Sequence, residues 1–226
     1  MCIRDRGKPR LLGLRRAIRG GESAGTGVPQ AMKMPARKPE VVVVGASAGG
    51  VEALLGLFDG LPAGYGLPLV AVLHLPDNRE SLLPDLFARR LALRVKEAQD
   101  KEVLQPGTLY FAAPGYHLCI EADRSFSYSR EEPVHFSRPS IDYLFESAAD
   151  AYGAKAMGIL LTGANQDGAA GLYTIKQRGG VTVVQDPQEA QVATMPEAAL
   201  ALHQPDYLLS LRGILALLAE LDSRPC

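Results

Sequence analysis

Apolar residues in this chain follow two patterns that alternate along its length. Nearly continuous apolar runs, such as residues 41–44 and 69–73, are typical of strands buried on both faces of a parallel sheet. Between them, apolar residues recur at the spacing of amphipathic helices. The pattern predicts strands over 40–44, 68–74, 156–161, 181–185 and 207–211, and helices over 50–58, 80–93, 140–152, 168–178, 196–202 and 214–221.

The middle of the chain has a different pattern. Three short segments separated by turns, 107–112, 117–121 and 125–129, predict an antiparallel section at one edge of the sheet. The helix over 80–93 is expected to present one apolar face, formed by Leu82, Leu83, Leu86, Phe87 and Leu91. The fold class is therefore α/β, a three-layer αβα sandwich with a mainly parallel sheet and a short antiparallel edge section.

Composition adds a division of the chain. Its 226 residues, 47% hydrophobic and 22% charged, suffice for one substantial core. Residues 1–39 carry ten Lys and Arg against two acidic residues, whereas 40–226 carry 14 basic and 23 acidic residues. We expect 1–39 to be a disordered or spurious basic extension, with Met32 or Met34 as the natural start, and 40–226 to be one acidic domain that does not bind nucleic acid.

Other classes of protein are not supported. No apolar stretch approaches the ~20 residues that span a bilayer. The three cysteines, Cys2, Cys119 and Cys226, have no metal-binding or disulfide spacing, which favours a reducing, cytoplasmic location and predicts an inert thiol at Cys119. We expect no metal and no cofactor.

Three predicted strand ends carry the residue types of a nucleophilic triad. Ser47 lies between Gly45 and Gly49 in a G-x-S-x-G turn, His74 ends an apolar strand, and Asp167 lies in a glycine-flanked loop. A serine hydroxyl needs a base to take its proton, and the base needs a third group to hold its tautomer. Because ligands bind beyond the carboxyl ends of parallel strands, this placement predicts a serine hydrolase.

Each residue also has an alternative interpretation. The turn around Ser47 could bind phosphate, although the G-x-G-x-x-G spacing is absent. His74 could be an ordinary buried histidine, and Asp167 could cap the helix that follows it. If the triad forms, backbone N–H groups of Ala48 and of the 163–165 loop, Ala164 above all, are candidates for stabilising an oxyanion.

His117 and Asn165 are candidates for the rim of the same site.

Together these segments resemble the catalytic domain of the CheB protein-glutamate methylesterase family. The resemblance rests on G-A-S-A-G-G, L-H-L-P, P-G-T-L-Y-F-A-A-P-G-Y-H-L, S-R-P-S-I-D-Y-L-F-E-S-A-A, L-L-T-G-A-N-Q-D-G-A-A-G-L, G-G-V-T-V-V-Q-D-P and A-T-M-P-E-A-A-L, and it covers about residues 40–221. It implies that Ser47 attacks glutamate γ-methyl esters of chemotaxis receptors, with His74 as base and Asp167 as its orienter. It also implies that receptor glutamines can be deamidated.

The resemblance further implies a bacterial signalling role. The partners would be cytoplasmic helices of methyl-accepting receptors, with a methyltransferase or histidine kinase of the same pathway. Two departures are visible: 39 residues are too few for the phosphoacceptor receiver domain that precedes chemotaxis members, and Ala164 stands where many members have methionine. A non-catalytic signalling scaffold and a small-molecule carboxylesterase are the alternatives.

Overall fold

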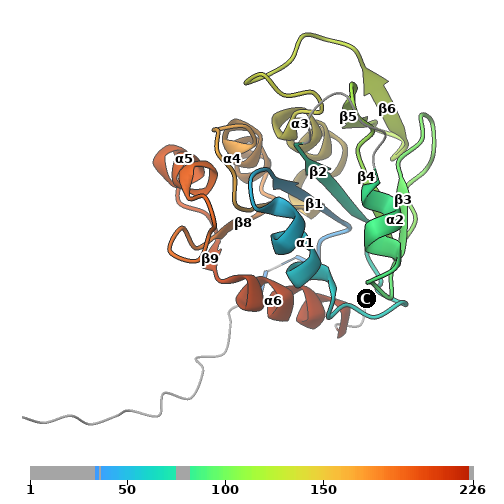
Figure 1. Cartoon of the computed structure of the whole chain (residues 1–226), viewed down its shortest axis with the longest axis horizontal. Helices are drawn as coiled ribbons and strands as arrows, with labels where there is room; N and C mark the ends of the chain where they lie inside the picture. Colours follow the sequence, from blue (N-terminus) through green and yellow to red (C-terminus); the bar gives the residue numbers. More distant parts are fainter. Residues whose placement is uncertain (1–33, 36, 75–81, 224–226) are drawn as a thin grey trace, which may run out of the picture. The chain divides into compact units, whose positions relative to one another are not determined.

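A computed structural model describes residues 34, 35, 37–74 and 82–223. Its main sheet has seven parallel strands in the order β3-β4-β2-β1-β7-β8-β9 (Figure 1). The strands are β1 (Val41–Ala46), β2 (Leu69–Leu73), β3 (Arg94–Glu97), β4 (Thr108–Phe111), β7 (Ala156–Leu160), β8 (Val181–Gln185) and β9 (Tyr207–Leu209). β1 is central, with Val42 opposite Leu69 of β2 on one side and Met157 of β7 on the other.

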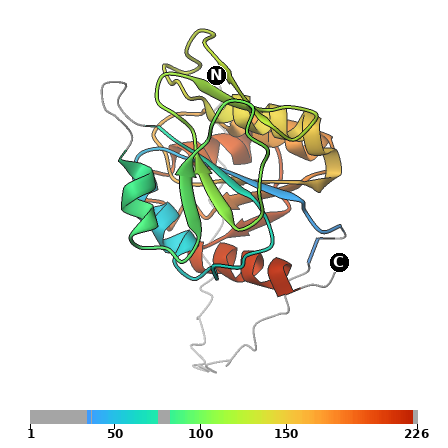
Figure 2. The same ribbon diagram turned by 90° about the vertical axis from the view of Figure 1, so that its right-hand side faces the viewer.

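Helices cover both faces of this sheet. One face carries α1 (Gly50–Phe58), α2 (Leu83–Ala88) and α6 (Leu211–Ser223); the other carries α3 (Ile141–Tyr152), α4 (Ala169–Gln177) and α5 (Thr194–Leu202) (Figures 1 and 2). All residues of β1, β2, β7 and β8 are buried, as expected for strands between two helical layers. The predicted three-layer α/β fold with a mainly parallel sheet is confirmed.

The antiparallel section differs from the expectation. β5 (His117–Ile120) and β6 (Phe126–Ser129) pair with each other in a separate two-stranded sheet that packs against α3. The first segment of the predicted section, 107–112, contains β4, a parallel strand between β3 and β2.

The helix predicted over 80–93 is also different. Its start lies outside the described residues, and α2 covers only Leu83–Ala88. Of the predicted apolar face, Leu83, Phe87 and Leu91 are buried, while Leu82 and Leu86 are exposed. The following residues form β3, which the pattern missed because its sequence, Arg-Val-Lys-Glu, has only one apolar side chain.

Within the described part of the chain, no helix is long and apolar enough to cross a membrane.

Candidate active site

Three loops that follow adjacent strands meet at one edge of the main sheet. β2, β1 and β7 are neighbours and run parallel, so the residues after them share this edge. Ser47 follows β1, His74 follows β2, and Asp167 lies in the loop between β7 and α4. Nε2 of His74 donates to Oδ2 of Asp167 over 2.7 Å. The fold thus brings together two of the three predicted side chains, 93 residues apart in sequence.

Asp167 is fully buried and accepts further hydrogen bonds from the start of α3. The Ser140 hydroxyl donates to it over 2.8 Å, and the N–H groups of Ile141 and Asp142 donate over 2.7 and 3.1 Å. Burial alone would raise the pKa of Asp167, but the hydrogen bonds from His74 and from these two backbone amides outweigh it and lower the pKa. Asp167 is therefore held as a carboxylate, the form that can orient an imidazole.

The same contacts show which helix Asp167 caps. Asp167 caps a helix, but the helix is α3, whose first amides point at its carboxylate. The helix that follows Asp167 begins after Gly168, with no side-chain cap. Asp167 therefore makes both contacts: it accepts a hydrogen bond from the imidazole of His74 and closes the start of α3.

Ser47 lies against the loop after β7. Its N–H donates to the carbonyl of Thr162 over 2.9 Å. A Cβ added to Gly163 would lie only 3.0 Å from the Cβ of Ser47, so the absence of a side chain at residue 163 allows this close approach. The Thr162 hydroxyl donates to the carbonyl of Ala48 over 2.8 Å and ties the two loops together.

The Ser47 hydroxyl has no hydrogen-bond partner among the described residues. The remaining ring nitrogen of His74, Nδ1, lies 3.3 Å from the hydroxyl of Ser137 instead. In enzymes without substrate, the hydrogen bond between nucleophile and base is often long and shortens only when substrate binds. The arrangement is a His–Asp pair with a half-buried serine on the adjacent loop.

Two backbone amides near Ser47 are available to an incoming group. The carbonyl groups of Ser47 and Gly163 each accept a hydrogen bond from an amide of α1 or α5, at 2.8 and 3.0 Å. Since N–H and C=O point in opposite directions across a trans peptide, the N–H groups of Ala48 and Ala164 face away from these helices. Neither N–H donates to an acceptor that the structure describes. Such amides can stabilise an oxyanion.

The two rim candidates have structural roles. His117 is fully buried and not at a rim: Nδ1 accepts from the N–H of Ser140 over 3.1 Å, Nε2 donates to the carbonyl of Glu132 over 3.2 Å, and the ring stacks on Tyr143. It therefore supports the residues that contact Asp167. Asn165 is half-buried, and its side-chain oxygen accepts from the N–H of Asp167 over 3.1 Å, which shapes the loop.

The sequence pattern did not identify Ser137 and Ser140 as site residues. Both belong to the S-R-P-S segment before α3, and the only available signal was Ser140 at the predicted helix start. Its hydroxyl does not cap α3 and instead donates to Asp167. Contacts of this kind depend on how α3 packs against β1, which local pattern cannot show.

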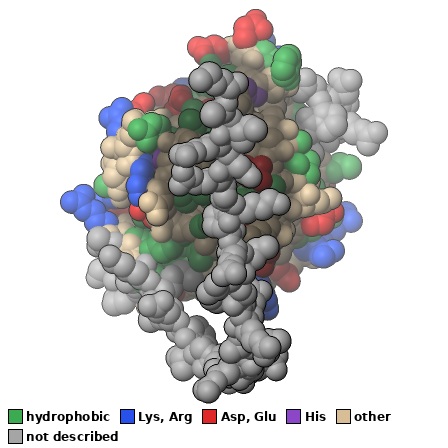
Figure 3. Space-filling view, turned by 90° about the vertical axis from the view of Figure 1, so that its left-hand side faces the viewer, with side chains coloured by type: hydrophobic (Ala, Val, Ile, Leu, Met, Phe, Trp, Pro, Cys, Tyr) green, Lys and Arg blue, Asp and Glu red, His purple; other side chains and the backbone are tan. Residues whose placement is uncertain are grey.

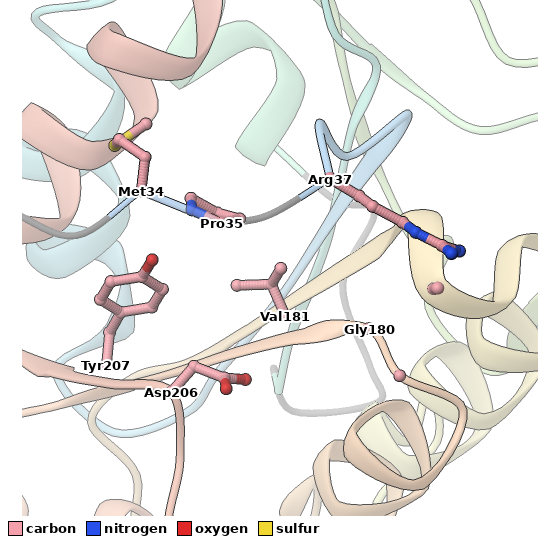
Figure 4. A pocket seen from close by; sticks show the side chains of 9 residues that line it. Met34, Pro35, Arg37, Gly180, Val181, Asp206 and Tyr207 are labelled. Carbon is pink, nitrogen blue, oxygen red and sulfur yellow. The ribbon is translucent and has the colours of Figure 1, made fainter.

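A cavity of about 620 Å³ lies at the opposite edge of the sheet (Figure 4). It is bounded by Met34, Pro35 and Arg37 before β1 and by Val181 and Tyr207 at the starts of β8 and β9. These residues precede the strands, whereas Ser47, His74 and Asp167 follow them, so the cavity is not part of the candidate site.

On the face shown in Figure 3, visible acidic and basic side chains are interspersed, without a patch of one sign. Among the described residues, no group of three or more His, Cys, Asp or Glu side chains could hold a metal ion.

Comparisons with known proteins agree with the geometry. The family model described as CheB methylesterase matches residues 42–218. A putative protein-glutamate methylesterase/protein-glutamine glutaminase of Leptospira interrogans is 45% identical over 183 residues, covering 81% of this chain and 95% of that protein. The crystal structure of the Thermotoga maritima CheB methylesterase catalytic domain matches with a TM-score of 0.78 and 31% identity, covering 81% of this chain and 98% of that domain.

Other relatives are longer. A protein-glutamate methylesterase/protein-glutamine glutaminase of Methanospirillum hungatei is 40% identical over 184 residues, but the match spans only 53% of its length. The family model covers most of the chain, and the Leptospira protein matches along nearly its whole length. The chain belongs to the CheB methylesterase family.

Proposed function

We propose that this chain hydrolyses γ-methyl esters of protein glutamate residues, with Ser47 as nucleophile, His74 as general base and Asp167 as the group that orients His74. The observation that carries the proposal is the 2.7 Å hydrogen bond from Nε2 of His74 to a buried carboxylate, at the sheet edge shared with Ser47. That bond keeps the proton on Nε2 and leaves the lone pair of Nδ1 free to accept one. The relatives' names support the choice of ester.

The reaction follows from these groups. The Ser47 oxygen attacks the ester carbonyl carbon while its proton passes to Nδ1 of His74. The N–H groups of Ala48 and Ala164 stabilise the oxyanion. The bond to the methoxy group then breaks, and Nδ1 returns the proton, so that methanol leaves. Water attacks the acyl-serine by the same route in reverse, which releases glutamate and restores Ser47.

The same groups also serve for a glutamine side chain, with ammonia in place of methanol. The relatives are named for both activities, which supports proposing deamidation as a second reaction. The proposed substrates are cytoplasmic helices of methyl-accepting receptors, in a cytoplasmic pathway that includes a methyltransferase or a histidine kinase. This extension rests on the family alone.

Release of methanol from a methylated receptor fragment tests the proposal. Ser47→Ala and His74→Ala should each reduce turnover by a factor on the order of 10⁴–10⁶, because the two groups act as one unit. The double variant should be scarcely slower than either single variant. Ser223→Ala is the matched control, because its hydroxyl bonds to the carbonyl of Glu220 within α6 and, among the described residues, to nothing else; its turnover should stay unchanged.

Three outcomes would contradict the proposal. Full methanol release by Ser47→Ala would remove Ser47 as nucleophile. No reaction of the wild-type protein with a fluorophosphonate, which labels activated serines, would favour a non-catalytic scaffold. Rapid hydrolysis of free short esters without release from the receptor fragment would favour a small-molecule carboxylesterase.

Asp167→Asn tests the orienting role. We expect a loss of turnover of ~10³–10⁴, because an amide can hold the wrong tautomer of His74. Stability should fall by about 1–3 kcal/mol, because the amide nitrogen cannot accept the hydrogen bonds that α3 now donates to the carboxylate. Turnover and urea unfolding measured together separate the two effects. A loss of stability with near-normal turnover would leave Asp167 a helix cap only.

A further inference from the structure

His74 has hydroxyl and carboxylate partners on opposite sides of its ring. Nε2 donates to Asp167, so Nδ1 carries the lone pair. The Ser137 hydroxyl lies 3.3 Å from Nδ1 and can only donate to it. One lone pair accepts one such proton, and the proposed reaction requires that it accept the proton of Ser47.

The backbone holds Ser137 in this place. Val134 and Ser137 exchange two backbone hydrogen bonds, of 3.1 and 2.8 Å, around His135 and Phe136, whose φ angles are 49° and 64°. Two consecutive left-handed residues between two residues that are bonded in this way form a type I′ turn, a compact connection. The chain after the turn is held as well, since the carbonyl of Arg138 accepts from an amide at 3.4 Å and its guanidinium donates to the carbonyl of residue 131.

The side chain of Ser137 remains able to move. It is half-buried, and among the described residues its hydroxyl is bonded only to His74. Rotation about one side-chain bond would therefore free Nδ1 without moving the turn, and such rotations take picoseconds to nanoseconds.

We propose that Ser137 is a positioning residue that occupies Nδ1 of His74 in the absence of substrate and thereby restrains the activation of Ser47. Substrate binding brings the Ser47 hydroxyl to Nδ1, and Ser137 releases it. This inference rests on the proposed function, because it takes Ser47 as the nucleophile. It predicts that the wild-type enzyme reacts with a small serine-directed probe more slowly than a variant without the Ser137 hydroxyl does.

The test is the second-order rate at which a fluorophosphonate labels Ser47, located by mass spectrometry of the labelled peptide. Ser137→Ala should label about two- to tenfold faster, the factor expected for losing one neutral hydrogen bond that competes with the reaction. Ser137→Thr keeps a hydroxyl and should label at the wild-type rate. Ser129→Ala is the matched control: its hydroxyl, just before the same loop, accepts from the N–H of Glu131 and does not contact His74.

Faster labelling of Ser137→Ala would show that the Ser137 hydroxyl restrains the reaction and does not merely support the loop, since damage to the loop would slow labelling. Slower or unchanged labelling of Ser137→Ala, measured well below its unfolding temperature, overturns the inference and leaves Ser47 as nucleophile. A label found on Ser137 itself, with Ser47→Ala still reactive, overturns the proposed nucleophile as well. Failure of the inference about Ser137 can thus be told apart from failure of Ser47 as the nucleophile.

Discussion

Asp142 lies beside the carboxylate that orients His74. It is buried, and its side chain accepts a hydrogen bond from the N–H of Gly171 over 2.7 Å, which links α3 to α4. Burial, and then the nearby negative charge of Asp167, raise the pKa of Asp142 to about 7. The pKa values of these two neighbouring carboxyl groups are thus shifted in opposite directions: Asp167 stays ionised, and Asp142 tends to keep its proton.

This contrast predicts a pH dependence of stability. The pKa of Asp142 is higher in the folded state than its ordinary value of 3.8, so the folded state binds the proton more tightly. The contribution of this protonated carboxyl group to the free energy of unfolding is fully present below pH ~4 and is lost as pH rises through about 7. Asp142→Asn, which is uncharged and still accepts from Gly171, should therefore become more stable relative to wild type as pH rises. The gain from pH 5 to pH 8 should be at least ~1 kcal/mol, since each pKa unit corresponds to about 1.4 kcal/mol.

Urea unfolding at the two pH values measures this gain. The control is Asp150→Asn on the same helix, where the carboxylate is exposed and paired with Arg178, so its effect should be small at both pH values. A difference between Asp142→Asn and wild type that is independent of pH would contradict the assignment.

At the level of elements, the contact between the β1 and β7 loops sets the position of Ser47. Gly163→Ala would place a methyl group 2.5 Å from the terminal carbon of Met195 and 3.0 Å from Ser47 Cβ. The methionine end is flexible and can move, whereas Ser47 must shift. We expect turnover to fall about 10²-fold, as for a small misplacement of a reacting group, with little change in stability.

Gly56→Ala in α1 is the matched control, because nothing lies within 4 Å of the added methyl group. It should leave turnover unchanged and raise stability by about 0.5–1 kcal/mol, because alanine favours a helix. Turnover and thermal unfolding of both variants provide the comparison. Unchanged turnover in Gly163→Ala would mean that the loops after β1 and β7 can move apart without displacing Ser47 from a reactive position.

Several elements were predictable because their local pattern agrees with their environment. Residues 50–58 and 181–185 form α1 and β8 at the predicted bounds. β4 was predicted to be antiparallel because short strands that are neighbours in sequence often pair, whereas it runs parallel between β3 and β2. The placement of Ser47, His74 and Asp167 at one edge of the sheet was predictable, because the ends of neighbouring parallel strands determine it. Ser137 and Ser140 were not, because only packing of α3 and the preceding turn brings them to His74 and Asp167.

At the scale of the whole molecule, deletion can test whether the basic segment at the start of the chain is needed for folding and turnover. The family match begins at residue 42, and the described core is built from residue 41 onward. We predict that a chain lacking residues 1–33 folds and releases methanol at the full rate. Thermal unfolding and turnover of the shortened chain test this, and loss of cooperative unfolding or of most turnover would show that the segment is structural.

The central position of β1 has a consequence for how the protein is made. β1 pairs with β7 across more than half the chain, and the carboxylate of the site is synthesised 93 residues after the imidazole. Contacts so distant in sequence form slowly, because closing the intervening loop costs entropy before any contact repays it. A nascent or prematurely ended chain can hold Ser47 and His74 without a group to orient the base. Under the proposed mechanism, full ester hydrolysis is therefore expected only after the segment that carries Asp167 has been synthesised and has folded against β1.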